Sequence, residues 1–277
     1  MAAAGRKRTE KEYVLGTHDD ELDRLGLQHD LWSEQARAAW RRAGFGRGQK
    51  ILDIGCGPGY ATLELARLVG NRGKIIGVDQ SKRFLSHLSA TLERRKMRNV
   101  ELKNADVEKL GLEGAGADGA YIRWVLCFVR HPAAVIAGTA RALKRGGKLV
   151  VQDYFNYEGV VIAPKQPITA RFFSAVGNSW RARGGNPDIG CELPRLMQRT
   201  GFEVTDIRPI VRLARPGDRL WNWPDSFFRN YVPILVDGGY ISRADGEAFQ
   251  QEWRERSRDP AAFFSTPPVI EIMAVKK

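Results

Sequence analysis

Glycines at alternate positions and acids at regular intervals are the residues of this chain whose types and spacing could do chemistry. The glycines are Gly55, Gly57 and Gly59. An apolar run that ends in Asp53 precedes them, and a second apolar run ends in Asp79, 20 residues after the last glycine. Because glycine has no Cβ, such a loop can turn sharply and let its backbone approach a ligand. An acid at the end of the second strand can accept hydrogen bonds from ribose hydroxyls.

The glycine spacing narrows the kind of ligand. A dinucleotide fingerprint has the form G-x-G-x-x-G/A, so a third small residue should stand at position 60 or 62. Those positions hold Tyr60 and Thr62. The loop is therefore G-x-G-x-G, which disfavours a nicotinamide dehydrogenase.

Alternating strand and helix patterns surround this loop, and they predict an open α/β sheet. A strand into Asp53 is followed by a helix over residues 60–69, and Ser81 is expected to cap the next helix. Apolar helical spacing predicts a further helix over residues 31–42, before the first strand. The other predicted strands are residues 74–79, 100–103, 118–122, 143–153, 201–210 and 268–275, and the other predicted helices are residues 81–95, 132–143, 190–200, 225–236 and 242–258.

In this order the segments resemble the class I S-adenosylmethionine-dependent methyltransferases of small-molecule type, similar to methyltransferase-domain-25 and ubiquinone–menaquinone methyltransferases. The match covers roughly residues 45–155. The resemblance implies a Rossmann-like, mostly parallel sheet of seven strands, in the order 3-2-1-4-5-7-6 with the last strand antiparallel. It also implies S-adenosyl-L-methionine as cofactor.

The resemblance assigns a set of residues to that cofactor. The glycines would wrap its methionine and ribose portion, Asp53 would lie near its ammonium, and Asp79 would take the ribose hydroxyls. Asp106 with the Val107 backbone would hold adenine. The residues assigned in this way are Tyr13, Gly16, Asp53, Gly55, Gly57, Gly59, Asp79, Gln80, Asp106, Val107 and Arg123.

Simpler roles stay open for several of these residues. Asp53 could cap the loop, Asp106 could cap a turn, and Arg123 could form a surface ion pair. The N-terminal segment, residues 1–44, could fold over the cofactor or form a plain amphipathic helix packed on the sheet. We expect one methyltransferase domain over residues 1–277, in which residues 154–188 and 211–266 are cap insertions that bind the substrate.

Candidate catalytic residues are harder to identify, because methyl transfer depends mainly on positioning. An oxygen acceptor would have to lose a proton, and a carbon acceptor would have to react as an enolate-like nucleophile. Asp153, Tyr154 and His18 are the candidates near the expected mouth of the site. The N-P-P-Y/F motif of amino-group DNA methyltransferases and the P-C dipeptide of cytosine-C5 enzymes are absent.

Composition bounds the class of protein. The chain has 277 residues, 43% of them hydrophobic, and no apolar run approaches the length needed to cross a bilayer. Cysteine and histidine spacing shows no metal-site pattern, so no metal is expected. The net charge is +12, mostly from arginine. We interpret it as a general arginine bias rather than a nucleic-acid surface. The default expectation is a cytoplasmic monomer or homodimer.

These observations favour methyl transfer to an oxygen or carbon of a small apolar or aromatic metabolite, because both expected insertions are rich in Phe, Tyr and Trp. An RNA or protein methyltransferase that uses the basic surface is one alternative. A cofactor-binding member of the fold that does not transfer methyl groups is another.

Overall fold

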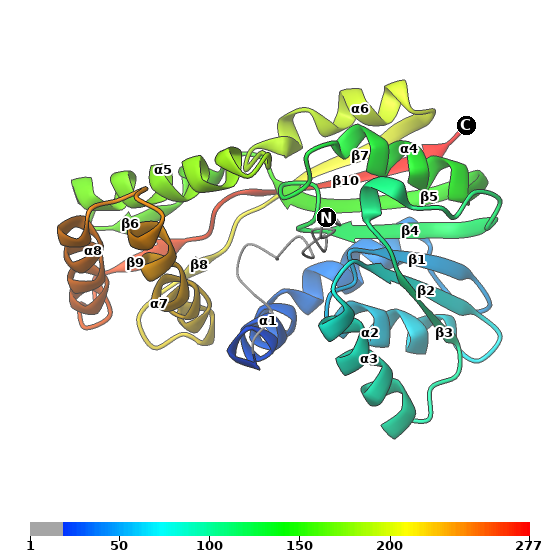
Figure 1. Cartoon of the computed structure of the whole chain (residues 1–277), viewed down its shortest axis with the longest axis horizontal. Helices are drawn as coiled ribbons and strands as arrows, with labels where there is room; N and C mark the ends of the chain where they lie inside the picture. Colours follow the sequence, from blue (N-terminus) through cyan, green and yellow to red (C-terminus); the bar gives the residue numbers. More distant parts are fainter. Residues whose placement is uncertain (1–18) are drawn as a thin grey trace, which may run out of the picture.

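A seven-stranded sheet forms the centre of the protein, and the computed structural model describes residues 19–277 of the chain (Figure 1). The predicted cofactor residues Tyr13 and Gly16 and the catalytic candidate His18 lie outside the described residues. The strands, in spatial order, are β3 (Val100–Asn104), β2 (Lys74–Asp79), β1 (Lys50–Ile54), β4 (Ala117–Arg123), β5 (Leu143–Tyr154), β10 (Val269–Lys276) and β7 (Phe202–Ile210).

The predicted fold class is confirmed. β1 pairs in parallel with β2 and β4, whereas β10 pairs antiparallel with both β5 and β7. Counting the seven sheet strands along the chain, their order is 3-2-1-4-5-7-6 with the last strand antiparallel. The central strands β1 and β4 are mostly apolar and buried, as is expected of strands covered on both faces, whereas the edge strand β3 is half-buried or exposed.

Helices cover the two faces of this sheet. In Figure 1, α1, α2 and α3 lie on one side and α4 and α6 on the other. Ser81 caps α3 by accepting a hydrogen bond from the Phe84 N–H at 3.2 Å, as its sequence position predicts. The helices beside the sheet are α1 (Asp19–Ala43), α2 (Tyr60–Val69), α3 (Lys82–Arg94), α4 (Pro132–Ala142) and α6 (Leu193–Arg199).

Helix α1 begins well before the predicted residues 31–42. Its second half buries apolar residues at helical spacing, including Trp32, Ala36 and Trp40, which is the signal that the sequence carries. Its first half buries polar residues instead, so apolar periodicity does not reveal it. The end of the helix is held by an ion pair between Arg42 and the buried Glu271 of β10.

A second body, which we call the helical lobe, stands beside the sheet where β7 and β10 run out of it (Figure 1). The lobe contains a small antiparallel sheet in the order β6-β9-β8, which the sequence patterns did not predict. Its elements are β6 (Val161–Ala163), α5 (Pro167–Ala182), β8 (Leu213–Ala214), α7 (Asn222–Asp237), α8 (Arg243–Arg256) and β9 (Phe263–Ser265). The predicted role of residues 154–188 and 211–266 as a substrate cap stays a prediction.

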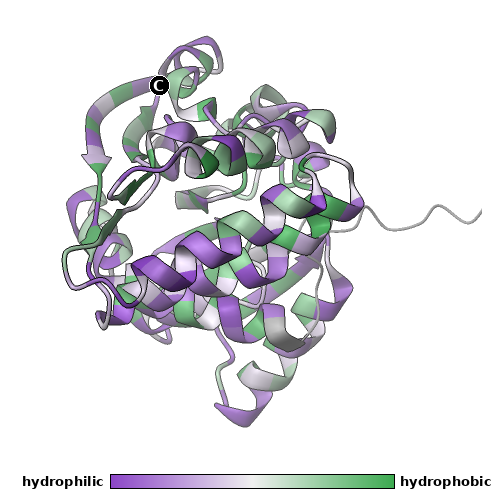
Figure 2. Ribbon diagram, turned by 90° about the vertical axis from the view of Figure 1, so that its left-hand side faces the viewer, coloured by the Kyte–Doolittle hydropathy of each residue, from purple (hydrophilic) through white to green (hydrophobic). Residues whose placement is uncertain are grey.

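Hydrophilic and hydrophobic residues alternate along the helices that face the viewer in Figure 2, as expected of helices between a core and solvent. Within residues 19–277, no helix has both the length and the apolar character that a membrane crossing requires. The same residues contain no cluster of three or more His, Cys, Asp or Glu side chains suited to a metal ion.

The lobe has its own aromatic core, which yields a stability prediction. Phe249 is fully buried, stacks on Phe172 with ring centroids 3.8 Å apart, and meets Phe228 edge-on at 4.9 Å. Phe249→Ala should lower the free energy of unfolding by about 3–5 kcal/mol, because it leaves a cavity. Phe263→Ala, at a residue 39% exposed, is the matched control and should cost about 0.5 kcal/mol or less. Denaturant unfolding measures both; equal losses would contradict this account.

Candidate active site

The glycine loop between β1 and α2 is shaped to admit a ligand on one side only. Gly55 and Gly57 both have positive φ, at 71° and 54°. A Cβ on Gly55 would fall 2.3 Å from Val125, so this glycine is required by packing. A Cβ on Gly57 would meet nothing within 4 Å, so its backbone faces open space. The loop therefore presents bare backbone to a cavity.

Asp79 at the end of β2 holds this loop in place. Its carboxylate accepts hydrogen bonds from the backbone N–H groups of Gly57 and Ser81, each at 2.8 Å. Burial raises the pKa of Asp79, and the backbone hydrogen bonds oppose that rise. A carboxylate has about four acceptor sites, so lone pairs remain for a ligand hydroxyl.

Asp53 lies deeper under the loop, near the end of β1. It is only 3% exposed and accepts a hydrogen bond from the Thr62 hydroxyl at 2.6 Å. Burial raises its pKa to about 6, although the Thr62 hydrogen bond and the charge of Arg123 favour the ionised form. A buried carboxylate of this kind attracts a cationic group, because pairing relieves the cost of burying its charge.

Asp106 caps a turn, which is one of the two roles left open for it, and its position at the cavity leaves adenine binding as a prediction. It caps a short 3₁₀ turn, Val107–Lys109, by accepting a hydrogen bond from the Glu108 N–H at 3.0 Å, and it lines the cavity. Gln80 and Val107 line the same cavity.

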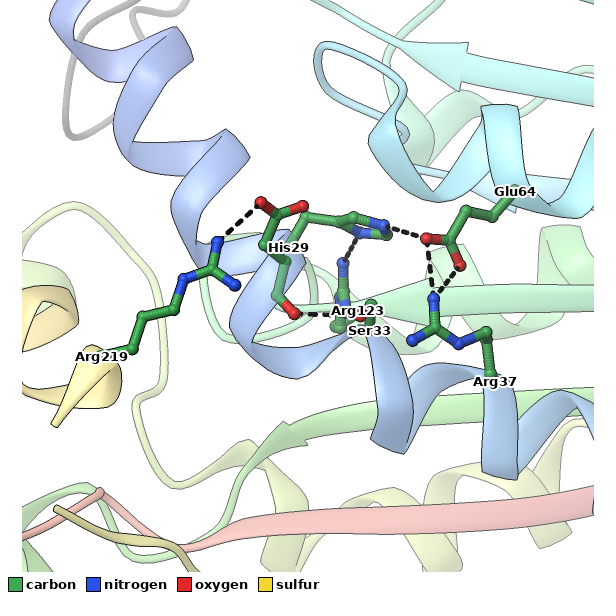
Figure 3. Close-up of polar contacts among 7 residues, drawn as sticks. His29, Ser33, Arg37, Glu64, Arg123 and Arg219 are labelled. Atoms are coloured by element: carbon green, nitrogen blue, oxygen red, sulfur yellow. Dashed lines mark hydrogen bonds and ion pairs between the residues drawn. The ribbon is translucent and has the colours of Figure 1, made fainter.

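Arg123, the last residue of β4, lines this cavity. Its side chain is held by a chain of polar contacts (Figure 3). Its Nη2 donates to Nδ1 of His29 at 2.9 Å. The other ring nitrogen, Nε2, lies 3.1 Å from Glu64 of α2, and Arg37 donates to both oxygens of Glu64 at 3.1 and 3.2 Å. The open alternative of a surface ion pair does not describe Arg123, because its guanidinium donates to the buried imidazole of His29.

Donor and acceptor chemistry fixes the tautomer of His29. A guanidinium can only donate, so Nδ1 must accept and Nε2 must carry the proton that Glu64 receives. Burial lowers the pKa of His29, with Glu64 opposing, so the imidazole is neutral near pH 7. Burial would raise the pKa of Glu64, but the His29 hydrogen bond and the charge of Arg37 outweigh it and lower that pKa.

The guanidinium of Arg123 keeps one donor for a ligand. Its Nη1 is buried, and no described residue accepts a hydrogen bond from it. A buried unpaired donor of positive charge costs free energy, and an anionic ligand group would satisfy it.

These elements line an open cavity of about 300 Å³ at the carboxyl ends of the parallel strands. It brings together most of the predicted cofactor residues: Asp53, Gly55, Gly57, Asp79, Gln80, Asp106, Val107 and Arg123. Gly59 does not line it. Its positive φ of 85° starts α2, and a Cβ there would fall 2.3 Å from Leu88, so this glycine is needed for turn and packing.

The catalytic candidates of strand β5 lie elsewhere. Asp153 is fully buried and lines neither this cavity nor its neighbour. Its carboxylate accepts from the backbone N–H groups of Leu126, Cys127 and Tyr154, at 2.9, 3.2 and 2.9 Å. This geometry favours an anchoring role for Asp153 over the predicted catalytic one.

A second and smaller cavity, of about 50 Å³, adjoins the first and extends under the helical lobe. Tyr154 lines it, but burial raises the pKa of its phenol well above the ordinary value, so the group stays protonated. Gln28, Trp124 and Phe128 line both cavities and mark their junction. The other lining residues are Arg24, Tyr157, Phe173, Trp180, Trp223, Pro224, Phe227, Phe264 and Pro267.

Several of these residues escaped the sequence reasoning. His29 carries a weak signal, because it precedes Trp32 by three residues and therefore shares the inward face of α1. Thr62 was noted only for its departure from a dinucleotide pattern. Trp124 carries no signal at all, since its role depends on a backbone turn at the end of β4.

Residues 51–147 match the family model of the methyltransferase domain. A curated relative, an uncharacterized 37.1 kDa protein in transposon TN4556 of Streptomyces fradiae, is 32% identical over 171 residues. That alignment covers 61% of this chain and 47% of the relative, so the chain spans about half of that protein's length. The demethylmenaquinone methyltransferase of Bacillus cereus (strain ATCC 10987 / NRS 248) is 25% identical over 225 residues, which cover 74% of this chain and 93% of the relative.

The fold has solved counterparts. The [4+2]-cyclase SpnF superposes with a TM-score of 0.57 at 19% identity, over 88% of this chain and 80% of that one. The residues found here also fit the family's cofactor. They are a bare glycine backbone, an acid at the end of β2, a buried carboxylate for an ammonium, and the guanidinium of Arg123, whose Nη1 is left for a carboxylate. The family-model match over residues 51–147 and the similarity to a demethylmenaquinone methyltransferase support a class I S-adenosylmethionine-dependent methyltransferase.

The unpaired donor of Arg123 predicts a loss of cofactor affinity. Arg123→Met should weaken binding of S-adenosylhomocysteine by about 10- to 100-fold, the range for a hydrogen bond to a charged group. Arg37→Met removes an arginine from the exposed end of the same chain of contacts and should change affinity less than about threefold. Calorimetric titration decides; unchanged affinity in Arg123→Met would remove this residue from the cofactor site.

Asp53 predicts a pH dependence of the same affinity. Its pKa of about 6 means that it is ionised above pH 6 and loses its charge below. Binding of the ammonium-bearing cofactor should therefore weaken as pH falls from 7.5 to 5, with a midpoint near 6. Asp53→Asn should flatten this dependence at a lower overall affinity.

Thr62→Val provides the matched test of the Asp53 prediction. The Thr62 hydroxyl stabilises the ionised carboxylate, so its loss should move the midpoint to higher pH. His29 and Asp79 face the same cavity and can titrate as well, but neither contribution depends on Thr62. A midpoint that stays in place in Thr62→Val would assign the pH dependence to one of those groups.

Proposed function

We propose that this protein transfers the methyl group of S-adenosylmethionine to an oxygen or carbon atom of a small apolar or aromatic metabolite. The observation that carries the proposal is the pair of adjoining cavities. The first has the groups that a methionine, a ribose and an adenine require, and the second is lined almost entirely by aromatic rings. A relative named demethylmenaquinone methyltransferase supports the same class of acceptor.

When bound, S-adenosylmethionine would supply an electrophilic methyl group, and its sulfur would keep the carbon–sulfur electron pair. The acceptor oxygen or enolate-like carbon would supply the electron pair of the new bond after losing its proton to solvent water. The residues of this chain position and enclose the partners. Arg123 and Asp53 orient the two charged ends of the amino acid, and Asp79 and Asp106 fix the other end. Trp124 stands between the cavities, and the aromatic walls exclude water from the acceptor.

A second candidate function is favoured by a specific observation. Among the residues that line the second cavity, none is Asp, Glu or His, so none offers a carboxylate or imidazole base. A member of the fold that uses the bound sulfonium to promote a rearrangement, without methyl transfer, would need no such base. The structural similarity to a [4+2]-cyclase is consistent with this alternative.

The deciding experiment is incubation with S-adenosylmethionine and a panel of phenols, quinols and polyketides. We expect one S-adenosylhomocysteine for each methylated product. Conversion of an acceptor without S-adenosylhomocysteine would establish the second candidate. Salt-sensitive methylation of RNA or of a protein would establish the remaining alternative. A cytoplasmic location and a monomeric or dimeric state stay predictions.

Phe227 predicts how the acceptor site can be separated from the cofactor site. This residue lines only the second cavity and stacks on Tyr231 with centroids 5.0 Å apart. Phe227→Ala should raise the KM of an aromatic acceptor about tenfold, because an aromatic contact is lost, and leave S-adenosylhomocysteine affinity unchanged. Phe263→Ala, on the lobe surface, should change neither quantity. An unchanged KM in Phe227→Ala would place the acceptor elsewhere.

A further inference from the structure

The polar chemistry of the second cavity is concentrated at one residue, Gln28 of α1. The walls of this cavity are mostly aromatic. The one charged residue among those that line it, Arg24, is paired with a carboxylate. Arg24 lines the cavity, and its Nε and Nη2 donate to the two oxygens of the buried Glu21 at 2.7 and 2.6 Å. The cavity therefore offers no net charge to an acceptor.

Two donor-only partners fix the orientation of the Gln28 amide. Nη1 of Arg24 lies 3.0 Å and the indole Nε1 of Trp223 lies 2.9 Å from the same Gln28 oxygen. Neither group can accept a hydrogen bond, so the atom between them must be the carbonyl oxygen. The amide nitrogen is thereby turned the other way.

The amide nitrogen of Gln28 is a hydrogen-bond donor that residues 19–277 leave without a partner. No described residue accepts a hydrogen bond from Nε2 of Gln28, although the residue lines both cavities. Its two N–H bonds are therefore available to a ligand at the junction of the two cavities. Because the oxygen is held from two elements, α1 and α7, the amide is preorganised before any ligand binds.

Trp124 also lies at the junction of the two cavities, and its backbone conformation there is unusual. It has a positive φ of 52°, a conformation that costs free energy for a bulky residue, and its ring stacks near Trp223 and Tyr154 at 6.3 and 6.1 Å. Its indole Nε1 is buried without a hydrogen-bond partner among the described residues. Strain kept at a cavity junction indicates that the position of this ring matters there.

We propose that Gln28 is a positioning residue for the acceptor, and that the acceptor is an uncharged or anionic aromatic ring bearing an oxygen that accepts a hydrogen bond from the Gln28 amide. This inference rests on the proposed function for the identity of the ligand, but not for the donor itself. The aromatic walls hold the ring, and the amide selects the orientation in which its oxygen faces the first cavity.

The test uses two probes that differ only in that oxygen. 1-Indanone has a carbonyl oxygen that can only accept, and indane has the same skeleton without it. Tryptophan fluorescence titration of the whole chain, with S-adenosylhomocysteine bound, should show about fivefold tighter binding of indanone, as expected for one net hydrogen bond. Equal affinity for the two probes in the unmodified chain would overturn the proposal.

Gln28→Glu is the sharpest variant, because a carboxylate keeps the acceptor for Arg24 and Trp223 but has no N–H to donate. The preference for indanone should fall to about onefold or reverse, while indane affinity stays the same. Gln198→Glu makes the same charge change on the exposed surface of α6 and should keep the preference. A preference that persists in Gln28→Glu would overturn the role of the amide.

The experiments distinguish failure of the proposed methyl transfer from failure of the proposed role of Gln28. If S-adenosylmethionine binds but no acceptor is methylated, the proposed function fails, and the indanone preference still reports on Gln28. Should Gln28→Glu unfold, the side-chain amide signals of Gln28 in nitrogen-15 NMR spectra of the unmodified chain replace it. A shift of these signals with indanone and not with indane supports the proposal, and no shift with either contradicts it.

Discussion

The structure around both cavities depends on the polar, buried face of helix α1. Glu21, Arg24 and His29 are each at most 5% exposed, and each is paired. A buried polar group that loses its partner costs about 1–3 kcal/mol, and a charged one more. Moving this helix would leave several such groups unpaired at once, so the pairing fixes the helix between the sheet and the helical lobe.

That constraint gives the two cavities a shared wall. Successive residues of α1 face different neighbours: Gln28 reaches Trp223 of the lobe, and His29 reaches Arg123 of the sheet. Tyr60, at the start of α2, donates its hydroxyl to the Leu22 carbonyl at 2.9 Å and stacks near His29. The helix thereby couples the position of the glycine loop to the position of the aromatic walls.

A buried carboxylate supports the junction from the opposite side. Asp153 accepts from two backbone N–H groups of the turn that follows Trp124, so the tryptophan is held in its strained conformation by a charge that the solvent does not reach. Burial raises the pKa of Asp153 to about 6, and the backbone hydrogen bonds oppose that rise. Position alone suggested catalysis for this acid; its hydrogen bonds assign it to the scaffold.

Apolar periodicity and glycine spacing were enough to predict the parallel strands, whereas the order of the sheet and the cavity residues that follow β1, β2 and β3 came from the resemblance to a known family. These features arise from local patterns, since each strand ends where its acid or glycine stands. The small sheet β6-β9-β8 was missed because its strands are two or three residues long and far apart in sequence. His29, Gln28 and the true start of α1 were missed as functional features because their inward face is polar, and only tertiary partners distinguish a paired buried residue from a solvated one.

The absence of a base among the residues that line the second cavity limits the chemistry that can occur there. On the proposed function, an acceptor would have to bring its own nucleophile, which an acidic phenol or an enolisable ring can do and a simple alcohol cannot. The negative charge of an anionic acceptor and the positive charge of the sulfonium would cancel during methyl transfer. A cavity lined by neutral aromatic rings solvates the two separate charges poorly, so it favours the uncharged products. A hydrogen bond from Gln28 would hold such an oxygen without protonating it. On this proposal, the neutral aromatic walls and the Gln28 amide together would favour acceptors that carry an ionisable oxygen.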